Sequence, residues 1–266
     1  FFKQKTAYEI GTGDWSSDVC SSDLSSGNVR HVKSMVEWMN GDKKETFAGE
    51  PNGVTRSYGK IYVTNTGSRT DVFDAETYEF ITCIGTGTWG EGGYQTVHAF
   101  DVTASQGAVF IRDKRKLVVV LEQDVQPGSA ARVPIYSRSV NLQEAMGTYA
   151  VAARNDGFLY VTAQNKNIIY LFDPADIRAG DTGFAPYLVT LGFEKSPQSI
   201  VFVGDRLFVT LRVDDKRSEL WEISSKNGKL LQDFTDSMVY PEKIAGARHT
   251  LLVVDRATQT VKAIGL

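Results

Sequence analysis

Lys60-Ile-Tyr-Val-Thr-Asn65 is the first of five short apolar segments that recur at a nearly constant interval along the chain. The central residues of the five segments are 48, 50, 48 and 44 residues apart. A period of this length is typical of a β-propeller, in which each repeat forms one four-stranded blade. The sequence therefore predicts an all-β propeller. In order, the central residues are Tyr62, Phe110, Tyr160, Phe208 and Leu252.

Each repeat is predicted to contain four strands joined by short polar turns. In the clearest repeat these strands are residues 53–58, 61–65, 70–73 and 80–84. Ile61, Tyr62 and Val63 form a continuous apolar run, which is typical of a strand covered on both faces. Asp74 and Asp173 directly follow two of the predicted third strands, and we expect them to be turn residues rather than ligands. The other predicted third strands are 117–121, 168–172, 220–223 and 261–264.

A second repeated signature marks the start of the inner strands. Pro51-Asn-Gly-Val54, Pro197-Gln-Ser-Ile200 and Pro241-Glu-Lys-Ile244 each end eight residues before the centre of the following apolar segment. With Gly59–Asn65 and Asp71–Asp74, this pattern resembles the NHL and YVTN repeats of six- or seven-bladed propellers over about residues 28–266. In two other repeats we place Thr96-Val-His-Ala99 and Gly147-Thr-Tyr-Ala150 at the same position, although both lack the proline.

The first 24 residues are set apart from the repeats. Lys3–Ile10 and Asp14–Leu24 resemble, in the right order, the translation of a sequencing-library adaptor. We therefore interpret residues 1–24 as a non-native, disordered segment and residues 25–266 as the propeller. On this interpretation Val29–Trp38 and Glu45–Ala48 form half a blade, four full blades follow, and the last blade is incomplete. This count predicts an N-terminally truncated propeller of six blades, or seven if more than half a blade is lacking.

Composition excludes several classes of function. Without residues 1–24, 27 basic and 28 acidic residues remain, so bulk charge predicts no attraction to nucleic acid or to an anionic membrane. Cys83 is then the only cysteine, which excludes an internal disulfide or a cysteine zinc site, and we expect it in the core. No apolar run approaches the roughly 18 residues that a membrane-spanning helix needs.

No catalytic motif stands out in the sequence. Gly85-Thr-Gly-Thr-Trp-Gly90 matches a dinucleotide-binding pattern, but the following residues predict a strand instead of the helix which that motif requires. His31, His98 and His249 do not share metal-ligand spacing. A nucleophile elbow, an HExxH helix and a phosphate loop are also absent from the sequence.

Several polar and aromatic residues are predicted to surround the channel of the propeller. Trp89 and Tyr94 lie in a loop between blades, where exposed aromatic rings can stack on a sugar or anchor a partner. His98 is expected at the start of an inner strand beside the channel. The remaining positions that we expect to face the channel are Asn52, Gln95, Tyr149, Asn155, Gln198 and Glu242.

The favoured hypothesis is a monomeric, non-catalytic propeller that binds a protein or glycan at the channel mouth and needs no cofactor. The resemblance implies a bacterial protein that is periplasmic, secreted or lipid-anchored. It also implies an alternative, because lactonase-like and lyase-like propellers hold a divalent cation on the axis. In that case a hard cation such as calcium would be bound by Glu242, His98 and Asn52. Glu242 is the one acidic residue at the start of an inner strand, and this shortage of acidic ligands disfavours a metal-dependent enzyme.

Overall fold

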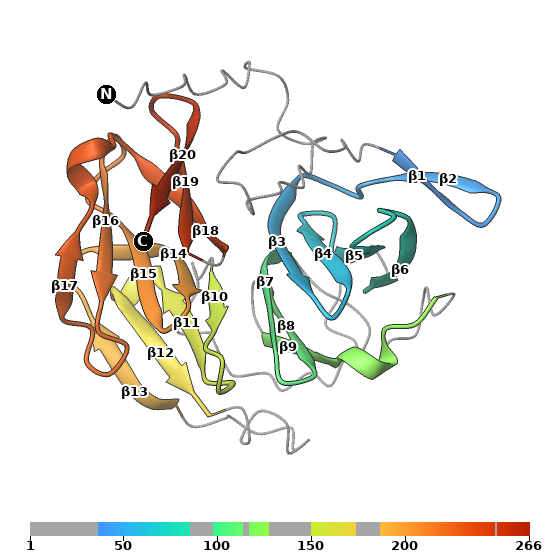
Figure 1. Cartoon of the computed structure of the whole chain (residues 1–266), viewed down its shortest axis with the longest axis horizontal. Coiled ribbons are helices and arrows are strands. Elements are labelled where there is room, and N and C mark those ends of the chain that lie inside the picture. Colours follow the sequence, from blue (N-terminus) through green and yellow to red (C-terminus); the bar gives the residue numbers. More distant parts are fainter. Residues whose placement is uncertain (1–36, 86–97, 114–116, 128–149, 174–186, 248) are drawn as a thin grey trace.

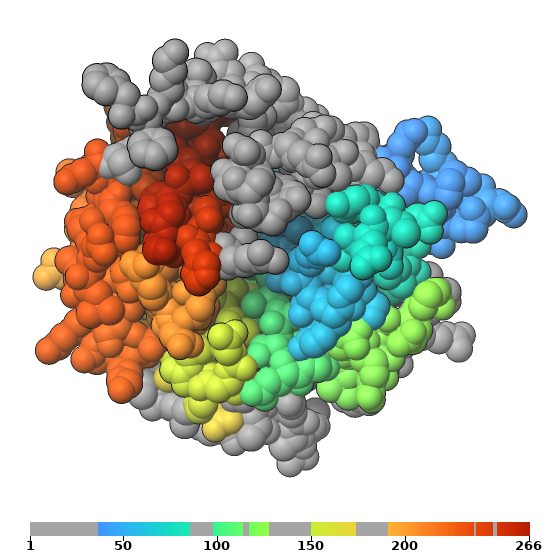
Figure 2. All heavy atoms as spheres, viewed as in Figure 1, coloured from blue at the N-terminus to red at the C-terminus, as the bar shows by residue number. Residues whose placement is uncertain are grey.

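A computed structural model describes residues 37–85, 98–113, 117–127, 150–173, 187–247 and 249–266 (Figure 1). Within these residues the strands form five antiparallel sheets of three or four strands and one separate hairpin. The sheets follow one another around the centre of the molecule in chain order, as the colours of the space-filling view also show (Figure 2). Each sheet uses consecutive strands, with the first strand innermost. This arrangement confirms the predicted β-propeller.

The bounds of the strands agree closely with the repeats in the sequence. The first blade contains β3 (Pro51–Ser57), β4 (Lys60–Asn65), β5 (Arg69–Asp74) and β6 (Phe80–Ile84), and the second contains β7 (Ala99–Ser105), β8 (Ala108–Asp113) and β9 (Leu117–Leu121). The third contains β10 (Val151–Ala153), β11 (Leu159–Ala163), β12 (Ile168–Phe172) and β13 (Tyr187–Gly192). The fourth contains β14 (Ser196–Val203), β15 (Arg206–Arg212), β16 (Ser218–Ile223) and β17 (Leu230–Asp233). The fifth contains β18 (Pro241–Ala247), β19 (Thr250–Asp255) and β20 (Thr260–Gly265).

Most of the core lies between neighbouring blades. Tyr62, Phe110, Tyr160 and Phe208 in the second strands have no exposed surface, which confirms that both faces of these strands are covered. The strand β19 differs, because Leu251 and Val253 are buried against the fourth blade whereas alternate residues of β19 are only half-buried. Cys83 is buried in β6, as predicted. Asp74 is also a turn residue as predicted, since its Oδ1 accepts hydrogen bonds from the backbone N–H groups of Glu76 and Thr77 at 2.8 Å.

The expected number of six or seven blades is wrong for the described part of the chain, which contains five. The predicted half blade, Val29–Trp38 and Glu45–Ala48, overlaps two strands, β1 (Glu37–Asn40) and β2 (Lys43–Thr46). Among the described residues these strands pair only with each other. This hairpin is fastened to the first blade, because Trp38 packs edge-on against Phe73 at 5.0 Å and stacks on Phe80 at 5.6 Å. Sequence spacing could not separate such a hairpin from two strands of a blade.

Side-chain hydrogen bonds to the backbone connect each of several blades to the next one. Between the second and third blades, the Thr103 Oγ1 accepts from the Ala153 N–H at 3.3 Å and the Ser105 hydroxyl donates to the Arg154 carbonyl at 3.2 Å. Between the fourth and fifth blades, the Ser218 hydroxyl donates to the Pro241 carbonyl at 2.5 Å. These bonds give backbone groups at the edges of neighbouring blades a partner in the adjoining blade.

Candidate functional site

The channel mouth, defined as the end where the inner strands begin, is shaped by β-bulges. In four blades the pairing of the inner strand with the second strand skips one residue. A bulge leaves the skipped residue unpaired and turns its side chain away from the regular alternation. The four skipped residues are Asn52, Phe100, Gln198 and Glu242.

A threonine near the end of the second strand holds the backbone next to the mouth in three blades. Thr64 Oγ1 accepts from the Gly53 N–H at 2.9 Å, and Thr210 Oγ1 accepts from the Ser199 N–H at 3.0 Å. In the third blade Thr162 Oγ1 accepts from the Ala150 N–H at 3.1 Å. The bulge residues therefore project from a backbone that is fixed by side-chain hydrogen bonds.

Asp101, the residue after the bulge of the second blade, joins three inner strands. Its Oδ1 accepts from the Val102 N–H at 3.0 Å and its Oδ2 from the Val151 N–H of β10 at 2.9 Å. On the other side it touches β3, where a Cβ added to Gly53 would lie 2.6 Å from Asp101 Oδ1. Burial raises the pKa of the Asp101 carboxyl, while the positive charge of Lys243 on β18 acts in the opposite direction.

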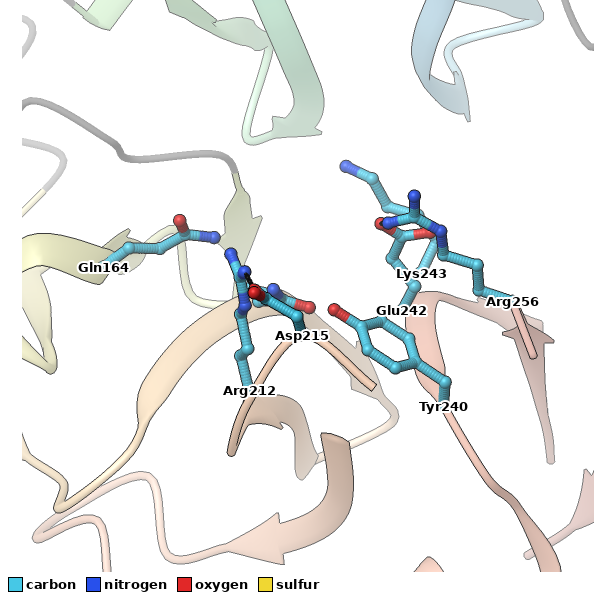
Figure 3. A pocket seen from close by; sticks show the side chains of 8 residues that line it. Gln164, Arg212, Asp215, Tyr240, Glu242, Lys243 and Arg256 are labelled. Atoms are coloured by element: carbon cyan, nitrogen blue, oxygen red, sulfur yellow. Dashed lines mark hydrogen bonds and ion pairs between the residues drawn. The ribbon is translucent and has the colours of Figure 1, made fainter. Parts of the chain in front are cut away.

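A pocket of about 430 Å³ opens at the mouth between the fourth and fifth blades (Figure 3). The bulge residues Gln198 and Glu242 both line it, so two predicted site residues from different blades meet here. Tyr240 directs its hydroxyl toward Asp215 and Arg212 across the pocket (Figure 3). The lining residues within the described part of the chain are all polar or aromatic: Gln164, Gln198, Arg212, Asp215, Tyr240, Glu242, Lys243 and Arg256.

The charged groups of the pocket are partly paired. Arg212 forms an ion pair with Asp215, and Arg256 forms one with Glu242 at 3.3 Å. The Arg256 guanidinium also lies 5.8 Å from the centre of the Tyr240 ring, within reach of a cation–π interaction. Lys243 has no carboxylate within 4 Å among the described residues. The two carboxylates are thus paired with arginines. Lys243 forms no such ion pair among these residues, although its charge acts on the buried Asp101 carboxyl of β7.

Two neutral groups of the pocket also lack hydrogen-bond partners among the described residues. Gln198 is only 9% exposed, yet its Oε1 accepts no hydrogen bond. Tyr240 is 4% exposed, its backbone N–H donates to Asp255 Oδ1 at 3.0 Å, and its hydroxyl makes no hydrogen bond within this part of the chain. A buried amide without a partner is costly, and it is a common feature of a position that a ligand or water completes.

The other predicted site residues lie apart from this pocket or outside the described part of the chain. Asn52 is at the bulge of the first blade, where its Nδ2 is buried without a described partner. His98 donates from Nδ1 to the Thr66 carbonyl at 3.1 Å, and its ring lies 5.9 Å from Phe100. Asn155 is in the turn between β10 and β11, at the end of the blade opposite the mouth. Trp89, Tyr94, Gln95 and Tyr149 lie outside the described residues.

The alignment of the second blade needs a correction. Thr96–Ala99 is the predicted start of its inner strand, but β7 begins at Ala99 and its bulge is at Phe100. Asp101 was missed for this reason. The signal was present, because counting eight residues back from Phe110 gives Val102, the position of Val54, Ile200 and Ile244 in their blades. The register of the third blade is likewise displaced, since Val151 pairs with Val161.

The described residues do not assemble a metal-binding group of three or more histidine, cysteine or acidic side chains. Two of the ligands in the axial-metal alternative are engaged elsewhere, since Glu242 pairs with Arg256 and His98 bonds to Thr66. The same part of the chain contains no helix that is long and apolar enough to span a membrane.

Comparisons with known proteins support the fold. No family model and no curated protein matches the chain. Among solved structures it is similar to a virginiamycin B lyase from Staphylococcus aureus, with a TM-score of 0.56 and 14% identity over 84% of this chain and 70% of that one. The chain is a β-propeller. It is also similar to the propeller domain of Cps50 (Swd1) from Myceliophteria thermophila, with a TM-score of 0.55 and 13% identity over 84% of this chain and 73% of that one.

The WD40 domain of Pan2 from Neurospora crassa is a third similar structure, with a TM-score of 0.52 and 10% identity over 82% of this chain and 67% of that one. These neighbours include an enzyme as well as a WD40 domain. At such low identity they establish the fold and not the activity, because the same propeller carries unrelated functions. The function has to be argued from the mouth pocket itself.

Proposed function

We propose that this chain is a non-catalytic β-propeller that binds a protein or glycan ligand at its channel mouth. The observation that carries the proposal is the polar pocket in which Gln198 and Glu242 meet from neighbouring blades. Both residues occupy bulges, and Gln198 keeps a buried amide oxygen without a described partner. A concave site with a few convergent polar groups is the usual place for a ligand.

The sequence signatures support the same proposal. The proline-led inner strands resemble NHL and YVTN repeats, and residues at the starts of these strands border the mouth. That resemblance is also the reason to propose an exported bacterial protein. No cofactor is required by binding of this kind. The metal-dependent alternative has less support, because its ligands Glu242 and His98 have other partners.

The proposal is tested by measuring binding of the purified chain to a glycan array and to a displayed peptide library. We expect Gln198→Ala to weaken binding about tenfold, the typical effect of losing a hydrogen bond in a buried site. The control is Glu76→Ala, an exposed residue in the turn after β5 at the end opposite the mouth. Unchanged binding by Gln198→Ala and Glu242→Ala, with wild-type melting temperatures, would overturn a function at this pocket.

A further inference from the structure

The polarity of the mouth pocket restricts its ligand. None of the described residues that line it is aliphatic, and Tyr240 is the single aromatic residue among them. Protein partners usually insert apolar or aromatic anchors into pockets with apolar walls. A ligand that displaces water from polar walls must replace the lost hydrogen bonds with its own donors and acceptors. The lining therefore favours a ligand that carries many polar groups, such as a sugar.

The charge of the pocket points to an acidic ligand. Among the described lining residues, the three cations Arg212, Lys243 and Arg256 exceed the two carboxylates, Asp215 and Glu242. Each carboxylate is already paired with an arginine. Lys243 has no described carboxylate within 4 Å. In Figure 3 it lies across the pocket from Arg212, and its amine points away from Tyr240. An added negative charge would be attracted by the excess cation, and most strongly where water is excluded.

The groups without partners complement a hydroxylated acid. The Gln198 amide oxygen can accept a hydrogen bond from a ligand hydroxyl, and the Tyr240 hydroxyl can donate to or accept from another. The Lys243 ammonium can donate to a carboxylate in a charge-assisted hydrogen bond. On this basis we propose that the mouth pocket binds a sugar residue that carries a carboxylate group. This inference rests on the proposed function and narrows its ligand.

The test uses glucuronate and galacturonate as probes, with glucose, inorganic phosphate and N-acetylglutamate as comparisons. Binding to the purified chain is measured by titration calorimetry at low ionic strength. We expect at least one uronate to bind about tenfold more tightly than glucose, as a charge-assisted hydrogen bond would provide. High salt should reduce this difference.

Variants of Lys243 show whether the carboxylate is recognised where we propose. Lys243→Gln should abolish the preference for uronate over glucose, and Lys243→Arg should keep it because the charge remains. The control is Lys226→Gln, an exposed lysine in the turn after β16 at the opposite end of the fourth blade. Binding is measured well below the melting temperature of each variant, so that the modest loss of stability expected for Lys243→Gln is not mistaken for a loss of binding.

Each other result overturns the inference. Equal binding of glucose shows that the carboxylate is not recognised, and equal binding of phosphate or N-acetylglutamate shows that the sugar is not. A preference for uronate that persists in Lys243→Gln places the carboxylate elsewhere. If no probe binds, the inference of an acidic sugar ligand is wrong. The glycan array and the peptide library then test separately whether the mouth binds any ligand.

Discussion

At the scale of single residues, Gly53 allows the inner strands of the first two blades to come close. A Cβ at this position would lie 2.7 Å from Asp101 Cα and 3.0 Å from Thr64 Oγ1. The backbone of β7 cannot move away freely, because Asp101 is held by hydrogen bonds to Val102 and Val151. The contact thus depends on the absence of a side chain at residue 53.

We expect Gly53→Ala to lower the free energy of unfolding by about 1–3 kcal/mol, the usual cost of overpacking. Urea unfolding of the wild type and the variant measures this change. The matched control is Gly192→Ala at the end of β13, where an added Cβ would have no heavy atom within 4 Å. Equal stability of the two variants would show that β3 and β7 are not packed as closely as described.

Asp71 is a buried acid beside the hairpin β1–β2. Its Oδ1 lies 2.6 Å from Arg69 Nε, and its Oδ2 accepts from Asn65 Nδ2 at 2.9 Å. Burial raises the pKa of the carboxyl to about 7, because desolvation of the ionised form outweighs the attraction of Arg69, and the negative Glu45 raises it further. Ionised Asp71 is therefore less favourable in the folded chain than in the unfolded one.

This raised pKa gives a pH dependence with a defined sign. The folded state binds the Asp71 proton more tightly, so its contribution to stability is full at low pH and is lost as pH rises toward about 7. Asp71→Asn removes the titration. Urea unfolding gives the difference in unfolding free energy between Asp71→Asn and the wild type. We expect this difference to shift in favour of Asp71→Asn by about 1 kcal/mol or more between pH 5 and pH 8. Parallel curves for the two proteins would contradict the raised pKa.

At the scale of the elements, the blades could be predicted because their signals are local. The apolar run around Tyr62 and its four equivalents are contiguous in sequence, and each becomes a second strand within one or two residues of the expected bounds. Proline-led inner strands likewise placed Gln198 and Glu242 at the mouth. The second blade lacks that proline, which is why its register and Asp101 were missed.

The rest of the pocket could not be predicted, because it depends on how neighbouring blades are staggered. Arg212 ends the second strand of the fourth blade, whereas Tyr240 precedes the first strand of the fifth. Nothing in the spacing of these residues shows that they face one pocket. The predicted number of blades was wrong for a related reason. Whether β1 and β2 join a larger sheet or form a separate hairpin is decided by tertiary structure, which the spacing of residues does not show.

The second strands should control folding more than binding. Tyr160 of β11 has no exposed surface, packs edge-on against Phe202 at 5.0 Å, and its hydroxyl donates to the Ser225 carbonyl at 3.2 Å. We expect Tyr160→Ala to cost about 3–5 kcal/mol of stability, as other large-to-small changes in cores do. Tyr160→Phe should cost about 1 kcal/mol, because only the hydrogen bonds are lost. Thermal and urea unfolding measure both; similar losses would show that the ring itself contributes little.

At the scale of the whole molecule, the inner strands surround one channel, so residues of blades that are not neighbours can interact across it. Asp101 belongs to the second blade and Lys243 to the fifth, yet the charge of Lys243 acts on the Asp101 carboxyl. Blades otherwise contact their neighbours in sequence through the apolar clusters between them. The attraction between these two charges would therefore act between the second and fifth blades independently of those clusters.

A double-mutant cycle measures this link. We expect Asp101→Asn and Lys243→Gln to destabilise the chain non-additively, with a coupling of about 0.5 kcal/mol or more in urea unfolding at pH 8. Because burial raises the pKa of Asp101, lowering the pH protonates this carboxyl before an exposed aspartate and removes the attraction to Lys243. The coupling should thus decrease as the pH is lowered, and it should weaken in high salt. Lys226→Gln, at the opposite end of the fourth blade, should show no coupling with Asp101→Asn. Additive effects of Asp101→Asn and Lys243→Gln at pH 8 would mean that the two charges do not interact across the channel. Contacts between neighbouring blades would then be the ones that stabilise the propeller.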